Sequence, residues 1–500
     1  MKFRLAFATA VMLSVMALPA VATVHYVAPL GAVISGTPNG ARATPWPSVD
    51  AAIKSGKVIG GDSILMMDGD HGDLILWNAN FNSLVTIRAE NDKKAHVEFV
   101  LVRELGRNLL IQNLNVWPTN PYAQAPQLVA TWSNSSDITI DGLDVRGGED
   151  AGNFMAWDAA EWQRRATDGA VIEGVRTAVR RSTFTGVRFG IALSNVDGRV
   201  AGNIVNGYSA DGLRGNGARG IFRGNTVTNC VTIDDNHADG FQSFTSSSID
   251  GLIIERNRII EWTGAPNHPL RCSLQGIGMF DGFYDNLTIR NNIVAVRQGH
   301  GISVYGARNA TITNNTVVQV DGVPGPYPWL GVFDHKNGTP STNVTVANNL
   351  AMSFAGSTNA ARGNLFIDNG VIAIPAQVFD QVSTFGFVPK ATSGFVDTAN
   401  PAYAPLVDID RFMRPYRAGP DKGAREVGST MFMAPRTKTE IADQGPTADP
   451  VISPVVNADA TSDATSDATS DATPVTTTAG SAVATTGGMA KNGAKFVAAP

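Results

Sequence analysis

The chain has 500 residues, a formal net charge of −5, and Lys and Arg together make up 39 of its residues. A mildly acidic chain lacks the basic surface by which proteins bind nucleic acid, so we expect no nucleic-acid partner. With 51 glycines and 43% hydrophobic residues, the composition favours a globular protein built from many turns and short strands.

Residues 1–22 have the pattern of a secretory signal peptide. Lys2 and Arg4 form the basic start, an apolar run follows, and Ala20-Val21-Ala22 is a cleavage site. The apolar run is shorter than the ~20 residues that span a bilayer, and no later stretch reaches that length. We therefore predict a secreted protein, extracellular or periplasmic, with no membrane span.

Residues 23–100 are predicted to form an N-terminal cap and the first coils of a repeat structure. His25–Ala28 is a short strand, and Val49–Ser55 is a short helix with Ser48 as its N-cap. Asp62–Met67 and Leu84–Ala89 alternate in the manner of strands. A capping helix is expected because the open end of a solenoid exposes strand edges and core.

Residues 101–350 repeat one phrase, an Asn followed after one residue by a β-branched or apolar residue. The repeated asparagines are Asn203, Asn225, Asn257, Asn292, Asn315 and Asn349, at steps of 22, 32, 35, 23 and 34 residues. A step of roughly 22 residues with insertions is one coil of a parallel β-helix. We expect each Asn to take the left-handed bend between two strands and to hydrogen-bond to the next Asn along the stack.

A second repeat places a glycine before an apolar residue in every coil. Because side chains alternate along a strand, the apolar residues Ile191, Leu213, Phe241, Ile277 and Ile302 should face the core. The next residues, Ala192, Arg214, Gln242, Gly278 and Ser303, should then stack on the outer face of one sheet.

Other stretches depart from the repeat. Residues 122–131 and 147–167 are polar insertions, which in solenoids become loops on one side. Cys230 and Cys272 form either one disulfide, which export permits, or two buried free thiols. Residues 351–435 are predicted to be C-terminal coils and a cap, and residues 436–500, with their Ser-Asp-Ala-Thr repeats, a disordered tail.

Both ends of the predicted solenoid carry a family resemblance. The order Tyr26-Val27-Ala28-Pro29, capping helix and Val85-Thr86-Ile87-Arg88-Ala89 resembles the start of secreted right-handed β-helix proteins, among them polysaccharide lyases of the chondroitinase B and alginate lyase type. The stretch from Asp408 to Glu426 resembles the ending D-x-D-G-x-x-R-P … D-x-G-A-x-E of such proteins, with Arg411 in place of its Gly. The resemblance implies an all-β fold: a right-handed single-stranded parallel β-helix with an N-terminal capping helix and a disordered C-terminal tail. It also implies a pectate-lyase-like, carbohydrate-active protein.

Polar residues gather on the predicted outer face. The string His237-Ala238-Asp239-Gly240-Phe241-Gln242 resembles the H-x-D-G-x-Q strings of carbohydrate-active β-helix proteins, and Gly299-His300-Gly301 with Asp234-Asp235 resembles motifs of polygalacturonases. Our candidate catalytic residues are His237, Asp239, Arg271, His300 and Tyr305. Our candidate substrate-binding residues are Asp211, Arg214, Gln242, Ser303, Asp281, His335 and Lys336. Asp234, Asp235 and Asp239 also resemble the calcium ligands of a pectate lyase group, so Ca²⁺ is the candidate cofactor.

This clustering of acids, imidazoles and cations favours a polysaccharide lyase acting on a uronic-acid-containing polymer. β-Elimination needs neutralisation of the sugar carboxylate, for which Arg214, Arg271 and Gln242 are candidates. It also needs a base, His237 or His300, and an acid, Tyr305. Two alternatives stay open: a glycoside hydrolase using two of the carboxylates, and a non-catalytic surface or adhesion protein. We expect an anionic polysaccharide as the partner and a monomeric protein.

Overall fold

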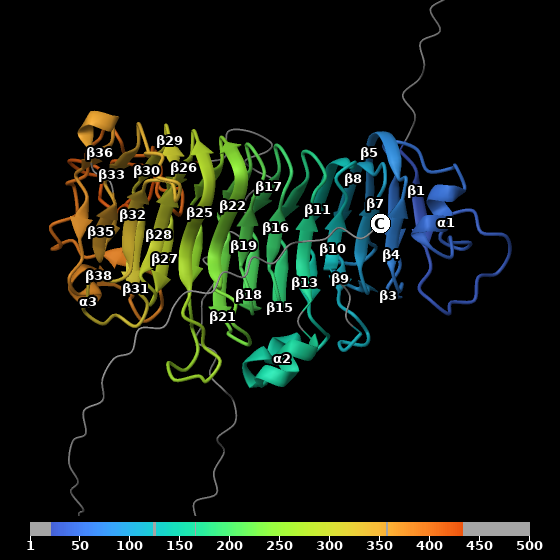
Figure 1. Cartoon of the computed structure of the whole chain (residues 1–500). Helices are drawn as coiled ribbons and strands as arrows, with labels where there is room; N and C mark the ends of the chain where they lie inside the picture. Colours follow the sequence, from blue (N-terminus) through green and yellow to red (C-terminus); the bar gives the residue numbers. More distant parts are fainter. Residues whose placement is uncertain (1–21, 124–126, 166, 357–358, 434–500) are drawn as a thin grey trace, which may run out of the picture. The chain divides into compact units, whose positions relative to one another are not determined.

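Three long parallel β-sheets form the solenoid in a computed structural model that describes residues 22–123, 127–165, 167–356 and 359–433 (Figure 1). Each coil contributes one strand to sheet 1, then one to sheet 2, then one to sheet 3, and neighbouring coils pair in parallel. The all-β parallel β-helix predicted from the repeats is confirmed. The apolar side chains that point inward from all three sheets form one continuous core along the coils.

The strands of each sheet follow one another along the solenoid. Sheet 1 contains β1 (Val24–Val27), β2 (Ser63–Met66), β5 (Asn80–Ala89), β8 (Arg107–Gln112), β11 (Ser136–Asp141), β14 (Ala178–Arg180), β17 (Arg199–Ala201), β20 (Ile221–Arg223), β23 (Ile253–Glu255), β26 (Thr288–Arg290), β30 (Thr311–Thr313), β33 (Thr345–Ala347) and β36 (Leu365–Ile367). Sheet 2 contains β3 (Gly69–Asp70), β6 (Ala95–Val97), β9 (Asn115–Val116), β12 (Asp144–Arg146), β15 (Thr183–Val187), β18 (Ile204–Tyr208), β21 (Thr226–Cys230), β24 (Arg258–Ile260), β27 (Ile293–Val296), β31 (Thr316–Gln319), β34 (Leu350–Ala351) and β37 (Gly370–Val371). Sheet 3 contains β4 (Leu74–Trp77), β7 (Val100–Arg103), β10 (Gln127–Thr131), β13 (Asp168–Ile172), β16 (Ile191–Leu193), β19 (Leu213–Gly215), β22 (Asp239–Asp250), β25 (Gln275–Asp285), β28 (His300–Tyr305), β32 (Trp329–Phe333) and β35 (Ser353–Gly356), with β29 (Ala307–Arg308) paired to β25.

Short helices and one hairpin complete the described part of the chain. The helix α1 (Val49–Lys54) begins at Ser48, whose hydroxyl accepts a hydrogen bond from the Ala51 backbone N–H at 3.0 Å, so the predicted N-cap is confirmed. The remaining elements are η1 (Ala151–Ala156), α2 (Ala159–Arg165), η2 (Ala360–Arg362), α3 (Pro375–Val378) and the antiparallel pair β38 (Phe379–Asp380) and β39 (Val388–Pro389).

A ladder of buried asparagines runs along the corner between sheet 1 and sheet 2, which we call the ladder corner. Each amide oxygen accepts hydrogen bonds from both the backbone N–H and the side-chain amide of the preceding Asn, as between Asn225 and Asn257 at 2.9 Å. The ladder includes all six predicted asparagines and continues to Asn369. At its N-terminal end Ser182 takes the place of an Asn, and its hydroxyl accepts from the Leu143 backbone N–H at 3.0 Å. The predicted ladder is confirmed.

The left-handed bend at this corner belongs to a different residue from the one we predicted. The residue immediately before the ladder Asn has the positive φ, for example 56° at Arg256 and 52° at Asn314. Glycine supplies the same conformation in other coils, as at Gly224 with φ of 64°. The ladder Asn itself stays available to hydrogen-bond along the stack because the preceding residue makes the turn.

The glycine repeat is explained by the core at the corner between sheet 2 and sheet 3. A Cβ at Gly240 would lie 2.2 Å from the Ile259 side chain, and a Cβ at Gly212 would lie 2.3 Å from that of Val227. The two sequence repeats therefore pack against each other. The β-branched residue two positions after a ladder Asn fills the space beside the glycine of the preceding coil. Predicted inward-facing residues such as Phe241 are fully buried.

The corner between sheet 2 and sheet 3 also carries the long insertions, so we call it the insertion corner. Residues 147–167, with η1 and α2, and residues 261–274 leave the solenoid there, and Figure 1 shows α2 projecting from this side. The two insertions touch through a hydrogen bond between His268 Nε2 and the Met155 carbonyl at 2.9 Å. Cys230 at the end of β21 is disulfide-bonded to Cys272, which ties the second insertion to the coil before it.

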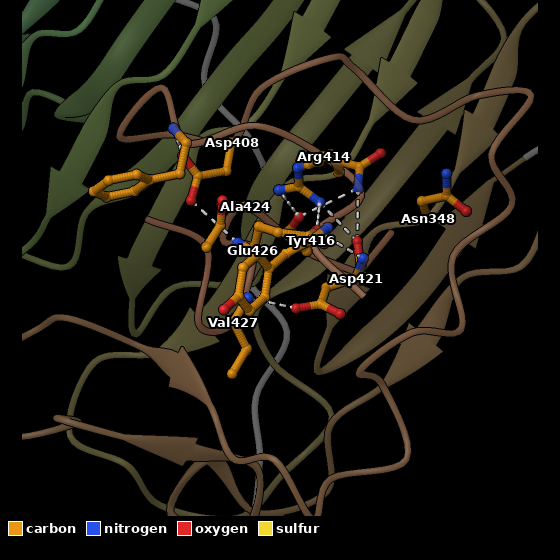
Figure 2. A network of polar contacts seen from close by, with 12 residues as sticks. Asn348, Asp408, Arg414, Tyr416, Asp421, Ala424, Glu426 and Val427 are labelled. Atoms are coloured by element: carbon orange, nitrogen blue, oxygen red, sulfur yellow. Dashed lines mark hydrogen bonds and ion pairs between the residues drawn. The ribbon is translucent and has the colours of Figure 1, made fainter. Parts of the chain in front are cut away.

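The C-terminal stretch from Asp408 to Glu426 closes over the ladder corner through a buried polar network (Figure 2). Arg414 donates to the carbonyls of Asp421 at 2.7 Å and Gly423 at 2.9 Å, and Glu426 accepts from the Asp421 backbone N–H at 2.9 Å. The network reaches the ladder corner where Asn314 donates to the Asp421 carbonyl at 3.0 Å. The buried charged residues of this stretch therefore hold the C-terminal cap against the coils.

Two of the predicted segments lie outside the described residues: the signal peptide at residues 1–22, apart from its last residue, and the tail at residues 436–500. The described residues fall within one compact unit. None of the helices in the described part of the chain is long and apolar enough to cross a bilayer.

Candidate active site

The outer face of sheet 3 presents side chains in rows that run across the strands. Ala192, Arg214, Gln242, Gly278 and Ser303 are direct partners on successive strands from β16 to β28, and we call them the central row. Their predicted register is confirmed. On the side of the insertion corner lies the edge row, the residues that precede the glycines: Asp168, Phe189, Asp211, Asp239, Gln275 and His300. Residues remote in sequence thus become neighbours at roughly 4.8 Å per strand.

Arg214 lies on β19, and Asp211 lies two residues before that strand begins. The Arg214 Nε donates to Asp211 Oδ2 at 2.6 Å, while Asp211 Oδ1 accepts from the Asp239 backbone N–H at 3.0 Å. Burial raises the pKa of the Asp211 carboxyl, although the Arg214 guanidinium opposes that shift. Arg214 is thereby held in one orientation, with its guanidinium 3.8 Å from the centroid of the Phe189 ring.

Asp239 is the next acid in the edge row and is almost fully buried. Its Oδ2 accepts from Gln242 Nε2 at 3.0 Å, and its Oδ1 has no hydrogen-bond partner in the described structure. Burial first, and then the neighbouring Asp211 charge, raise the pKa of Asp239 well above the ordinary range of an aspartate. Burial and the neighbouring acid therefore both favour the protonated form of Asp239.

Asp168 begins β13 and heads the edge row. Burial raises its pKa to about 6, with Arg188 and Arg214 acting in the opposite direction. Arg188 is exposed, and its guanidinium lies 5.0 Å from the centroid of the same Phe189 ring that Arg214 covers. Our sequence reasoning missed Asp168, although Asp168-Gly169 continues the glycine repeat by one more coil. We call Asp168, Arg188, Asp211 and Arg214 the arginine–carboxylate centre.

His300, Ser303 and Tyr305 form a second group on β28. His300 Nδ1 is 2.9 Å from Ser303 Oγ, which also accepts from Trp329 Nε1 at 3.0 Å. Burial lowers the pKa of His300 and raises that of Tyr305. Because β22 and β25 separate β28 from β19, this group lies roughly 14 Å from Arg214. The predicted base and acid are therefore not beside the predicted carboxylate-binding arginine.

Three further candidates lie at the C-terminal side of this sheet. Lys336 Nζ is 2.8 Å from Asp281 Oδ1, in an ion pair whose two side chains are about half exposed. His335 stacks on the Phe283 ring with 4.4 Å between centroids. This group joins β25, which carries Asp281 and Phe283, to the residues that follow β32, so it flanks the strand that carries His300 on both sides.

His237, Asp234 and Asp235 all lie on an exposed loop at the insertion corner. Within the described residues, the His237 side chain has no hydrogen-bond partner, and Asp234 Oδ1 accepts from the Asn236 backbone N–H at 3.0 Å. Across residues 22–433, apart from the gaps in the description, no three His, Cys, Asp or Glu side chains are grouped so that they could hold a metal ion. Asp234, Asp235 and Asp239 thus do not form the calcium ligand set that we predicted.

The prediction that Arg271 lies on the outer face is wrong. Arg271 is buried in the insertion 261–274, where its guanidinium pairs with Glu261 at 2.9 Å and with Asp321 at 2.8 Å. Arg271 and Asp321 border a cavity of about 570 Å³ on the insertion corner. Counting forward from β24 misplaced Arg271, because the chain leaves the solenoid between Glu261 and Leu274.

Aromatic side chains on the same face were also missed from the sequence. Tyr305 stacks on Phe333 with 4.7 Å between ring centroids, and Phe280 lies 5.8 Å from Tyr305. Trp329 contacts His300 edge to face at 4.8 Å. The sequence does predict their position: Phe280 and Phe333 come two residues after the outward-facing Gly278 and Gly331, and residues two apart in a strand face the same side.

Comparison with known proteins bears on the fold. A family model described as a right handed beta helix region matches residues 168–378, which agrees with the right-handed sense that we predicted. Similar solved structures include a pectate lyase, with 14% identity, a TM-score of 0.42, and coverage of 81% of this chain and 96% of that chain. A mannuronic acid-specific family 6 polysaccharide lyase from human gut microbiota has 14% identity, a TM-score of 0.40, and coverage of 64% and 83%.

Hydrolases occur among the similar structures too. An α-1,3-glucanase of family 87 from Streptomyces thermodiastaticus has 15% identity, a TM-score of 0.35, and coverage of 71% of each chain. No curated protein matches the chain. The protein is thus an all-β, right-handed parallel β-helix, a fold on which both lyases and hydrolases of polysaccharides occur.

Proposed function

We propose that this protein is a polysaccharide lyase that cleaves a uronic-acid-containing polymer by β-elimination at the arginine–carboxylate centre. The observation that carries the proposal is the position of Asp168, whose pKa is raised to about 6, beside Arg188 and Arg214 on an outer face of the solenoid. A carboxylate with such a pKa is ionised at neutral pH and is a stronger base than an ordinary aspartate.

The chemistry divides between the arginines and the acid. Arg188 and Arg214 bind the uronate carboxylate, which stabilises the negative charge that develops on it when the C5 proton leaves. Asp168 takes that proton, the electron pair forms the C4=C5 double bond, and the C4–O bond breaks. In a syn elimination the protonated Asp168 lies on the same side as the leaving oxygen and returns the proton to it.

The remaining acids prepare the centre for an anionic substrate. Asp211 orients Arg214 through the hydrogen bond to its Nε and leaves the other guanidinium nitrogens for the substrate. Burial first, and then the Asp211 charge, raise the pKa of Asp239, which disfavours a second negative charge near Arg214. An extracellular acidic polymer as the substrate agrees with the export that we predict from residues 1–22. Since the predicted calcium ligands are not gathered, no step is assigned to a metal.

The experiment is to incubate the protein with alginate, pectate, glucuronan and bacterial exopolysaccharides and to follow the ultraviolet absorbance of the unsaturated product. The wild-type protein is expected to generate it from one of these polymers, and Asp168→Asn and Arg214→Lys to lose at least about a hundredfold in kcat/KM. Asp234→Asn, which changes an exposed aspartate on the nearby loop, is the matched control and should retain activity. New reducing ends without that absorbance would contradict elimination.

A glycoside hydrolase is the second candidate, and the buried Asp211–Asp239 pair favours it. Asp211 accepts from the Asp239 backbone N–H at 3.0 Å, so two carboxyl groups lie on adjacent strands, and a glycoside hydrolase needs such a pair as its acid and its base. Both side chains are almost fully buried, whereas Asp168 is partly exposed, and this difference makes elimination at Asp168 our choice. A hydrolase would be inactivated by Asp239→Asn and would form reducing ends only. Binding of a polymer without either product would identify a non-catalytic surface protein.

A further inference from the structure

A third row of outward-facing side chains runs along sheet 3 beyond the central row, and we call it the outer row. It contains, strand by strand, Trp77, Arg103, Trp132, Glu173, Ser194, Asn216, Phe244, Phe280, Tyr305 and Phe333. A register shift between β22 and β25 pairs Phe244 with Asp281, the residue after Phe280. Figure 1 shows the strands that carry it side by side from β4 to β32. The row therefore forms one surface strip that crosses ten coils.

The N-terminal end of the outer row is a cluster of two tryptophans and an arginine. The Arg103 guanidinium lies 5.1 Å from the centroid of the Trp77 ring and 5.2 Å from that of Trp132. The indoles are 44% and 39% exposed, which is unusual for so large an apolar side chain. The cluster presents two rigid apolar surfaces and a fixed positive charge to solvent.

The C-terminal end of the outer row is also aromatic. Phe244 is 41% exposed and lies 5.6 Å from the Arg214 guanidinium. Phe280, Tyr305 and Phe333 continue the strip on the next three strands, and Lys336 Nζ lies 5.9 Å from the Phe280 ring centroid. Cations accompany the rings at this end as they do at the other.

The middle of the outer row is polar. Glu173, Ser194 and Asn216 follow β13, β16 and β19, and Glu173 comes five residues after Asp168, roughly 16 Å along an extended strand, so the centre lies beside this part of the row. Arg214 reaches from the centre toward the row, with its guanidinium 5.6 Å from the Phe244 ring. The centre therefore has three coils of aromatic and cationic surface on its N-terminal side and four on its C-terminal side. An exo-acting enzyme, whose site binds the end of a polysaccharide, would have such a surface on one side of the site only.

We propose that one acidic polysaccharide chain is held by the aromatic side chains at both ends of the outer row and crosses the arginine–carboxylate centre between them, so that the enzyme cuts within the polymer. This inference rests on the proposed function of the centre. The rings contact the apolar C–H faces of the sugars, Arg103 and Lys336 pair with their carboxylates, and one position recurs every roughly 4.8 Å along the polymer.

The experiment compares Trp77→Ala/Trp132→Ala with Phe280→Ala, using polymers and oligosaccharides of graded length. Trp117→Ala is the matched control, because Trp117 also stacks under an arginine, Arg146 at 5.0 Å, but lies at the end of β9 on sheet 2. Each row variant is expected to raise KM for long chains by about tenfold, with kcat kept and with little change for short oligosaccharides. Affinity electrophoresis of the same substitutions in the Asp168→Asn background measures binding apart from cleavage.

The sizes of early products complete the test. At low conversion the wild-type enzyme should yield a broad range of long fragments and a rapid fall in viscosity. Release of only mono- or disaccharides from the start, or equal losses of binding in the row variants and in Trp117→Ala, would overturn the inference while leaving the proposed function intact. A wild-type protein that binds and cleaves no polymer would overturn both.

Discussion

Replacing Asn257 by alanine is expected to cost about 4 kcal/mol of unfolding free energy, although the side chain is far from the candidate active site. Asn257 is fully buried in the middle of the ladder. Its Oδ1 accepts from the Asn225 backbone N–H and from the Asn225 side chain, both at 2.9 Å. Its Nδ2 donates to the Phe222 carbonyl and to Asn292 Oδ1, both at 3.0 Å.

The magnitude follows from what alanine leaves behind. The Asn225 backbone N–H loses its acceptor in a site without solvent, which costs about 1–3 kcal/mol, and each of the three other lost bonds contributes about 0.5–1.5 kcal/mol. Asn257→Ser should cost only about half as much, because a serine hydroxyl supplies the acceptor, as Ser182 does for Leu143. Asn369→Ala, at the half-buried end of the ladder, should cost about 1 kcal/mol, because water replaces the lost partner.

Urea unfolding of the three variants, followed by circular dichroism at a constant m-value, measures these differences. The order of stability loss should be Asn257→Ala, then Asn257→Ser, then Asn369→Ala. If Asn257→Ala and Asn369→Ala were equally mild, the ladder would be a consequence of the stacked coils and would not stabilise them.

Three further predictions concern the centre, the insertion corner and the core. Since Asp168 must be ionised to act as a base and its pKa is raised to about 6, kcat/KM should fall tenfold per pH unit below that value, and a pH profile with no limb near 6 would exclude this role. Replacing Cys230 and Cys272 by serine should lower the unfolding free energy by about 4 kcal/mol, because the disulfide restricts a loop that spans 42 residues in the unfolded chain. A calorimetric scan with and without reductant measures the loss, and an unchanged Tm would contradict this prediction. Gly240→Ala places a Cβ 2.2 Å from the Ile259 Cγ2 and should destabilise by about 2 kcal/mol. Because Ile259→Ala removes that Cγ2, the double variant should lose less stability than the sum of the two single losses, and additive effects in that double-mutant cycle would refute the contact.

The repeated parts of the fold were predictable because each coil must satisfy the same local rules. The asparagine and glycine repeats fixed the register correctly, so that Arg214, Gln242 and Ser303 were placed in one row. The left-handed residue was assigned one position too late, because both residues of pairs such as Asn314-Asn315 are compatible with the bend.

The candidate site was less predictable where the period is broken. Arg271 was misplaced because insertion length carries no information about the direction in which a loop folds. Asp168 was missed because Phe189 interrupts the polar residues of the edge row, so the row does not look continuous in the sequence. The pKa of Asp168 depends on burial by residues of several coils, which no single stretch of sequence reveals.

The ladder corner and the insertion corner divide two tasks between opposite ends of each sheet 2 strand. Amide contacts hold successive coils at the first corner, whereas the second tolerates inserts of very different length, from residues 188–190 to residues 147–167. Loops at the insertion corner can therefore change length in evolution, or be replaced by design, without disrupting the amide contacts that hold the coils together. Substrate preference on this scaffold should then be transferable as whole loops, with the strands and their asparagines left untouched.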